Sequence, residues 1–152
     1  MSKRRLVLVA AVLAAAGVLA LTLTHAMAKS DAAIPAWLSA QAAWEVQHNT
    51  DSSSSAPQVQ PSGQWALVSQ DAASKVMGYP PPSSPSATVY LVVLHGSFVA
   101  NNGLAPNANA AQFHGDTIVF TMDPASHLVD DWQITPSPVD VSSVSGLSSF
   151  TP

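Results

Sequence analysis

The chain has 152 residues, with nine acids, five Lys or Arg and no Cys. Three of the bases precede residue 6, so from Lys29 onward only Lys29 and Lys75 oppose nine acids, a net charge of −7. This charge argues against binding to nucleic acid or to an anionic membrane surface, because both require clustered Lys and Arg. Without disulfides, the fold depends on a hydrophobic core.

The first 28 residues have the pattern of an export segment. A basic start is followed by residues 6–23, which carry no charge, and then by Ala26 and Ala28 in the A-x-A pattern of a signal peptidase site. Cleavage there would make Lys29 the first mature residue. The uncharged run of 18 residues also approaches the roughly 20 that span a bilayer, so an uncleaved anchor is the alternative. We expect a secreted or extracytoplasmic protein, or a single-pass anchored protein with its domain outside.

Residues 29–135 are predicted to form one small domain that begins with a helix. Pro35 suits the first turn of a helix over residues 34–48, a segment rich in helix formers. Its apolar residues include Trp37 and Trp44, through which we expect the helix to pack on a sheet.

A strand and a second, short helix follow. Residues 64–69 (QWALVS) form an apolar run typical of a strand. Gln70–Met77 then predicts one or two helical turns, with Ser69 or Asp71 as the N-cap and Gly78 just past the C-terminus.

Three more strands are predicted downstream, over residues 87–99, 116–123 and 127–135. The first is almost continuously apolar and β-branched, which indicates a central strand, whereas the second alternates and fits a sheet with one covered face. Ser and Pro dominate residues 136–152, so this tail is predicted to be disordered or loosely packed. The fold class is therefore α+β: an N-terminal helix on a curled antiparallel sheet of about four strands, preceded by an apolar export helix.

The segment from Asp123 to Leu128 (DPASHL) carries a family resemblance. It resembles the hairpin turn of PepSY-type domains, which has Asp, two variable residues, Ser or Thr, Gly and then Val or Leu; His127 stands at the Gly position. A helix packed on such a hairpin is similar to the cystatin-like arrangement of that family. The resemblance implies a small extracytoplasmic interaction or inhibitory module, and it transfers no functional residue.

Motifs for chemistry are lacking. Four histidines follow the export segment, but none forms an H-x-x-x-H or H-E-x-x-H pair, and no G-x-S-x-G surrounds a serine. We therefore assign no catalytic, cofactor-binding or metal-binding residue and expect no cofactor. Asp130 and Asp131 would point to opposite faces of a strand and are interpreted as solvated edge charges. The aromatic and histidine residues that remain as a candidate interaction surface are Trp37, Trp44, His95, His127 and Trp132.

Together these features predict an exported binding or interaction module, with an inhibitory or regulatory role in the cell envelope, rather than an enzyme. Its expected partner is an extracytoplasmic protein or peptide, and the membrane is contacted only through an uncleaved N-terminal segment. Two alternatives remain: a small cell-envelope hydrolase or enzyme accessory that uses His95 or His127, and a structural surface protein whose tail is a spacer.

Overall fold

The computed structural model describes residues 33–52, 60–100 and 113–152. These residues form two helices and five strands, which confirms the α+β class and adds one strand to the predicted sheet. In chain order the elements are α1 (Ala36–Asn49), β1 (Ser62–Ser69), α2 (Gln70–Met77), β2 (Thr88–Val99), β3 (His114–Met122), β4 (Val129–Thr135) and β5 (Ser148–Phe150). The proposed export segment and its cleavage residues Ala26, Ala28 and Lys29 lie outside the described residues.

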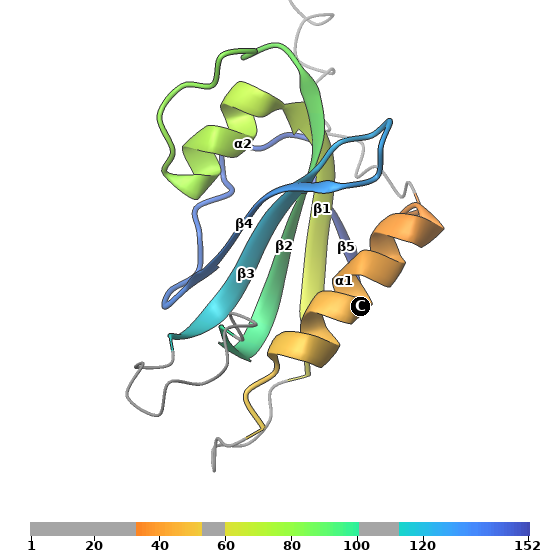
Figure 1. Ribbon diagram of the computed structural model, residues 1–152, viewed down its shortest axis with the longest axis vertical. Helices are drawn as coiled ribbons and strands as arrows, with labels where there is room; N and C mark the ends of the chain where they lie inside the picture. The colour runs from red at the N-terminus through yellow and green to blue at the C-terminus, as the bar shows by residue number, and fades with distance from the viewer. Residues whose placement is uncertain (1–32, 53–59, 101–112) are drawn as a thin grey trace, which may run out of the picture.

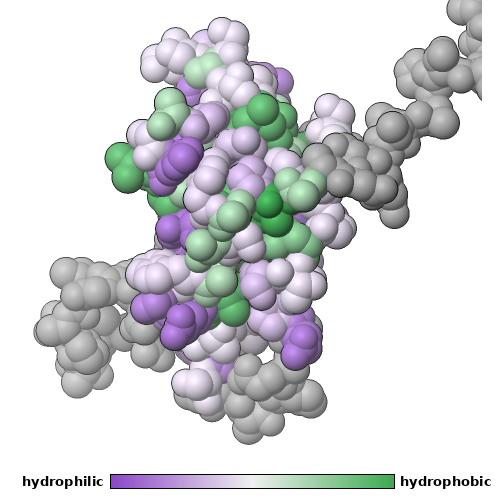
Figure 2. Space-filling model, turned by 90° about the vertical axis from the view of Figure 1, so that its right-hand side faces the viewer, coloured by the Kyte–Doolittle hydropathy of each residue, from purple (hydrophilic) through white to green (hydrophobic). Residues whose placement is uncertain are grey.

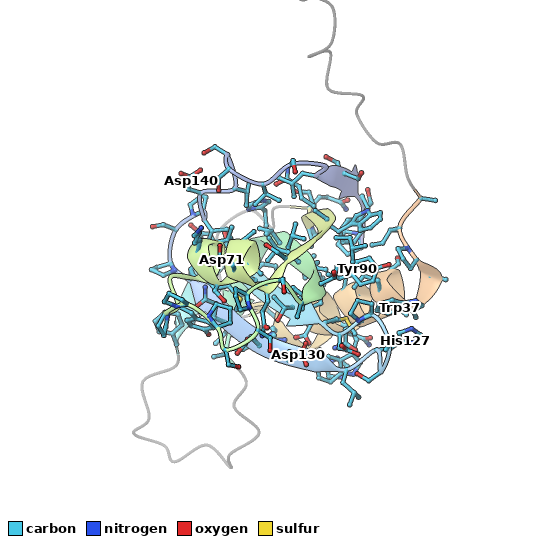
Figure 3. The ribbon with its side chains drawn as sticks, turned by 90° about the horizontal axis from the view of Figure 1, so that it is seen from above. Trp37, Asp71, Tyr90, His127, Asp130 and Asp140 are labelled. Atoms are coloured by element: carbon cyan, nitrogen blue, oxygen red, sulfur yellow. The ribbon has the colours of Figure 1, made fainter. Side chains whose placement is uncertain are left out.

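All neighbouring strands pair antiparallel, in the order β4-β3-β2-β1-β5. The two helices lie on opposite faces of this sheet (Figures 1 and 3). The prediction of one covered face is therefore wrong, because Val119 of β3 is as fully buried on the α2 side as Phe120 is on the α1 side. The buried core on the α1 side comprises Leu38, Ala42, Trp65, Val92, Leu94, Phe98, Ile118, Phe120, Met122 and Ile134. The core on the α2 side comprises Ala66, Ala73, Met77, Val89, Leu91, Val93, Val119 and Val144.

Helix α1 buries a narrow stripe with helical spacing, Leu38, Ala42, Glu45 and Asn49. Pro35 is the N-cap, one position before the first helical residue. The expectation that α1 packs through both tryptophans is wrong for Trp44, which is 50% exposed, because it lies on the outward side of the stripe. Trp37 is half-buried against the core.

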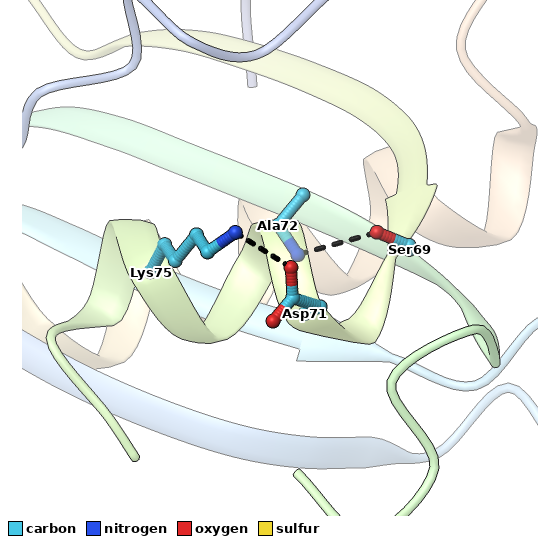
Figure 4. A network of polar contacts seen from close by, with 4 residues as sticks. All are labelled: Ser69, Asp71, Ala72 and Lys75. Carbon is cyan, nitrogen blue, oxygen red and sulfur yellow. Dashed lines mark hydrogen bonds and ion pairs between the residues drawn. The ribbon is translucent and has the colours of Figure 1, made fainter. Parts of the chain in front are cut away.

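Helix α2 is fixed by local hydrogen bonds at both ends. The Ser69 hydroxyl accepts from the backbone N–H of Ala72 at 3.2 Å, which confirms Ser69 as the N-cap (Figure 4). Gly78 has a φ of 70° and ends the helix in the left-handed conformation that glycine adopts readily. An exposed ion pair joins Asp71 and Lys75 at 2.7 Å, one turn apart (Figure 4).

The prediction that residues 136–152 form a disordered or loosely packed tail is wrong. Residues 136–147 cross the α2 face of the sheet, where Val144 is buried and Val139, Val141 and Leu147 pack against the core. The chain then adds β5 beside β1, with the Phe150 ring over Gly63. The Ser/Pro-rich composition did not indicate this packing, because the segment contacts the sheet through only four widely spaced apolar residues.

Within the three described stretches, no helix has the length and apolarity needed to cross a membrane.

Candidate interaction surface

The turn between β3 and β4 is a compact hydrogen-bonded loop. Asp123 Oδ1 accepts from the backbone N–H groups of Ala125 at 3.0 Å and Ser126 at 2.6 Å. Hydrogen bonds from the backbone and side chain of Ser126 lower the pKa of Asp123. His127 completes the turn with a φ of 58°, the left-handed region that favours glycine. The hydrogen bonds around it hold a non-glycine residue in that conformation, and so aim its imidazole.

The imidazole of His127 stacks on the indole of Trp37. Their ring centroids lie 4.0 Å apart with an interplanar angle of 13°. On α1, Trp37 also makes an edge-on contact with Tyr90 of β2, at 5.2 Å and 79°. Figure 3 shows these three labelled side chains together on the α1 side of the sheet. The start of α1, the start of β2 and the β3–β4 turn thus meet at one end of the sheet.

Exposed aliphatic side chains adjoin this aromatic group. Leu128, next to His127, is 65% exposed, and Val129 is 37% exposed. Leu67 of β1 is 52% exposed and lies directly opposite Tyr90 in the register, so both point to the α1 side. We call these six residues the aromatic patch: Trp37, Leu67, Tyr90, His127, Leu128 and Val129. The space-filling view of the α1 and β5 side shows hydrophobic residues gathered between polar regions (Figure 2).

Carboxylates border the aromatic patch along the hairpin. Asp123 closes the β3–β4 turn, and Asp130 and Asp131 lie near the start of β4. Burial, followed by the charges of Asp123 and Asp131, raises the pKa of Asp130. In the described part of the chain, Lys75 is the only Lys or Arg, and it is paired with Asp71 on α2. The aromatic patch therefore has an acidic border with no lysine or arginine to neutralise it among these residues.

The structure separates the five predicted surface residues. Trp37 and His127 come together, but Trp44 stacks on His48 at 4.1 Å on the outward side of α1. Trp132 donates its indole N–H to the buried carboxylate of Glu45 at 2.9 Å. His95 lies near the far end of β2, with its Nδ1 3.5 Å from the Thr117 hydroxyl.

Two polar arrangements were missed by sequence reasoning. The Glu45 carboxylate accepts from Gln41 at 2.9 Å, from Asn49 at 3.0 Å and from Trp132. The i±4 spacing of Gln41, Glu45 and Asn49 is the signal from which the first two contacts follow. The buried Asp51 carboxylate lies 2.9 Å from Nδ1 of the half-exposed His114, 63 positions away, and no sequence pattern indicates this contact.

The Asp51–His114 pair has the geometry with which a carboxylate orients an imidazole. It also ties the residues after α1 to β3, and the Asp51 backbone N–H donates to the Ser97 carbonyl oxygen of β2 at 3.0 Å. Among the described residues, no three His, Asp or Glu side chains are grouped so that they could hold a metal ion.

Comparison of the chain with protein-family models, curated proteins and solved structures finds no match.

Proposed function

We propose that this chain is an exported binding module that holds a protein or peptide partner at its aromatic patch. The observation that carries the proposal is the assembly of exposed apolar and aromatic side chains from four parts of the chain around the stacked Trp37 and His127. Contiguous exposed apolar surface with a polar border is typical of protein interaction sites. Rigid aromatic rings lose little conformational entropy on binding, which suits them as anchors.

The proposed setting is outside the cytoplasm. The basic start and the uncharged residues 6–23 support export, and the strongly acidic remainder is compatible with it. Cleavage after Ala28 gives a secreted module, whereas retention of residues 6–23 gives an anchored one. N-terminal sequencing of the exported product distinguishes the two, because a cleaved protein begins at Lys29.

The PepSY-type resemblance favours an inhibitory or regulatory role for this binding module. Two features support the resemblance. Helix α1 packs on a twisted antiparallel sheet, and His127 has a positive φ at the turn position where that family has glycine.

Site-specific photo-crosslinking in the exporting cell tests the binding role. A photoreactive phenylalanine analogue at position 128 lies in the aromatic patch, and the same analogue at Gln47, an exposed position on the outward side of α1, is the matched control. We expect a discrete adduct from position 128 and none from position 47. Equal labelling at both positions, or none at position 128, contradicts the proposal.

The same cells separate binding from catalysis. If the protein is a hydrolase, its function requires an oriented base, and the described arrangement nearest to one is Asp51 with His114. A binding module retains its adduct and its cellular effect in the His95→Ala and His114→Ala variants, whereas Leu128→Ser without the analogue loses the cellular effect. Loss in either histidine variant with the fold intact favours the enzymatic alternative.

A further inference from the structure

We propose that the aromatic patch and the adjoining outer edge of β4 bind an extended segment of another protein in which Lys or Arg alternates with large apolar side chains. This inference rests on the proposed function and specifies the chemistry of the partner. It combines three properties of one end of the molecule: an open strand edge, exposed apolar anchors and an acidic border.

The open edge belongs to β4. This strand is the last in the sheet order, and no described strand pairs with its outer side. An edge strand presents backbone N–H and C=O groups at the spacing that an added strand requires, so an extended segment can continue the sheet. The other edge is covered in part by β5, which pairs with Gly63, Gln64 and Trp65 of β1.

The apolar anchors lie where such an added strand would begin. Leu128 and Val129 are exposed at the start of β4, beside the Trp37–His127 stack. Full burial of one such side chain strengthens binding by about tenfold or more. A partner strand along β4 would cover them with apolar residues of its own.

The acidic border determines the charge of the partner. Asp123 closes the β3–β4 turn, and Asp130 and Asp131 follow near the start of β4, where Asp131 lies opposite Thr121 in the register. Burial, followed by repulsion from Asp123 and Asp131, raises the pKa of Asp130. A Lys or Arg placed among them relieves that repulsion. A second copy of this chain would instead bring three more carboxylates to the same edge, so the border rejects self-association while it admits a cationic strand.

The test uses the full chain, purified in the form that an exporting host yields, and two synthetic peptides about as long as β4. Both peptides alternate Val or Tyr with a charged residue, which is Lys in one and Glu in the other. We expect the Lys peptide to bind about tenfold more tightly, and to weaken several-fold when the salt concentration rises from low to physiological. Amide chemical-shift changes should centre on Val129–Thr135.

Matched variants locate the interaction. Asp130→Asn combined with Asp131→Asn should weaken binding of the Lys peptide about threefold to tenfold, and Leu128→Ser should weaken binding about tenfold. Asp116→Asn, an exposed acid near the opposite end of β3, should leave it unchanged.

The remaining outcomes overturn the inference. If both peptides bind equally and Leu128→Ser weakens both, the binding function stands but the cationic partner is wrong. If neither peptide binds, or if the shifts centre on α2 or β5, the β4 edge is not the docking site. A dimer in sedimentation experiments that Leu128→Ser dissociates identifies a second copy as the occupant and also refutes the proposal.

Discussion

Two replacements of Glu45, by Ala and by Gln, distinguish the loss of its buried hydrogen bonds from the loss of its charge alone. The side chain is 4% exposed and accepts from Gln41, Asn49 and Trp132, and only the last bond joins α1 to the sheet. In Glu45→Ala the indole N–H of the partly buried Trp132 loses its partner, at a cost of about 1–3 kcal/mol. The cavity adds to this, so we expect a total loss of unfolding free energy of about 3–4 kcal/mol.

Glu45→Gln is the matched control because it preserves the shape. The amide oxygen can keep the bonds from Trp132 and Asn49, while the amide nitrogen faces Gln41, whose own amide can flip to accept. The expected loss is therefore only about 1 kcal/mol, from weaker hydrogen bonds to a neutral acceptor.

Urea unfolding monitored by circular dichroism measures both variants on the full chain. Thermal unfolding should show a shift of about 4 °C for each kcal/mol lost. The reasoning fails if Glu45→Ala loses less than Glu45→Gln, or if the two variants lose equal amounts. Either result would mean that the hydrogen bond from Trp132 to Glu45 does not hold α1 on the sheet.

Five further substitutions test other parts of the structure in the same urea assay. A Cβ on Gly115 would lie 2.3 Å from the backbone oxygen of the facing strand, so Gly115→Ala should cost about 2–4 kcal/mol of unfolding free energy. Gly78 has a φ of 70° but open space around it, so Gly78→Ala should cost only about 1 kcal/mol. Equal costs would contradict the close approach of β3 and β4. Phe150→Ala should cost about 2 kcal/mol by releasing β5, and an unchanged midpoint would mean that β5 adds nothing to the fold. The pKa of Asp123 in the folded protein is lowered from 3.8, so the ionised carboxylate stabilises the fold fully well above pH 3.8. This contribution is lost as the pH falls through the folded pKa. An Asp123→Asn variant should lack that part of the acid sensitivity. Burial, followed by the charges of Asp123 and Asp131, raises the pKa of Asp130 from 3.8, so its charge opposes folding above that pKa. Asp130→Asn should therefore gain a few tenths of a kcal/mol at pH 7 after solvent screening, and a loss of stability would refute this account.

Local signals allowed much of the fold to be predicted from the sequence. The N-cap and C-terminal glycine of α2 were identified correctly because a serine hydroxyl and a left-handed glycine act within one helical turn. The central strand β2 was evident from its continuous β-branched and aromatic residues, since a strand buried on both faces lacks alternation.

Long-range contacts could not be predicted in the same way. Trp44 points outward because a different side of α1 packs on the sheet. Since α1 has apolar residues on several sides, its sequence does not specify which side that is. Strand β5 has only three residues and no periodic pattern, so its pairing with β1 depends on contacts far away in the sequence. Two of the six residues of the aromatic patch, Trp37 and His127, were named from the sequence, but their stacking required the turn geometry that Asp123 sets.

The crossing of residues 136–147 over the sheet has a consequence for the order of folding. Strand β1 is the first strand in the sequence, but its outer neighbour β5 is the last. The core on the α2 side also includes Val144, which lies shortly before β5. Pairings between distant parts of a chain are slow to form because the intervening loop must first be closed. If the chain crosses a membrane from its N-terminus, this domain can therefore complete its sheet only after β5 has emerged on the far side.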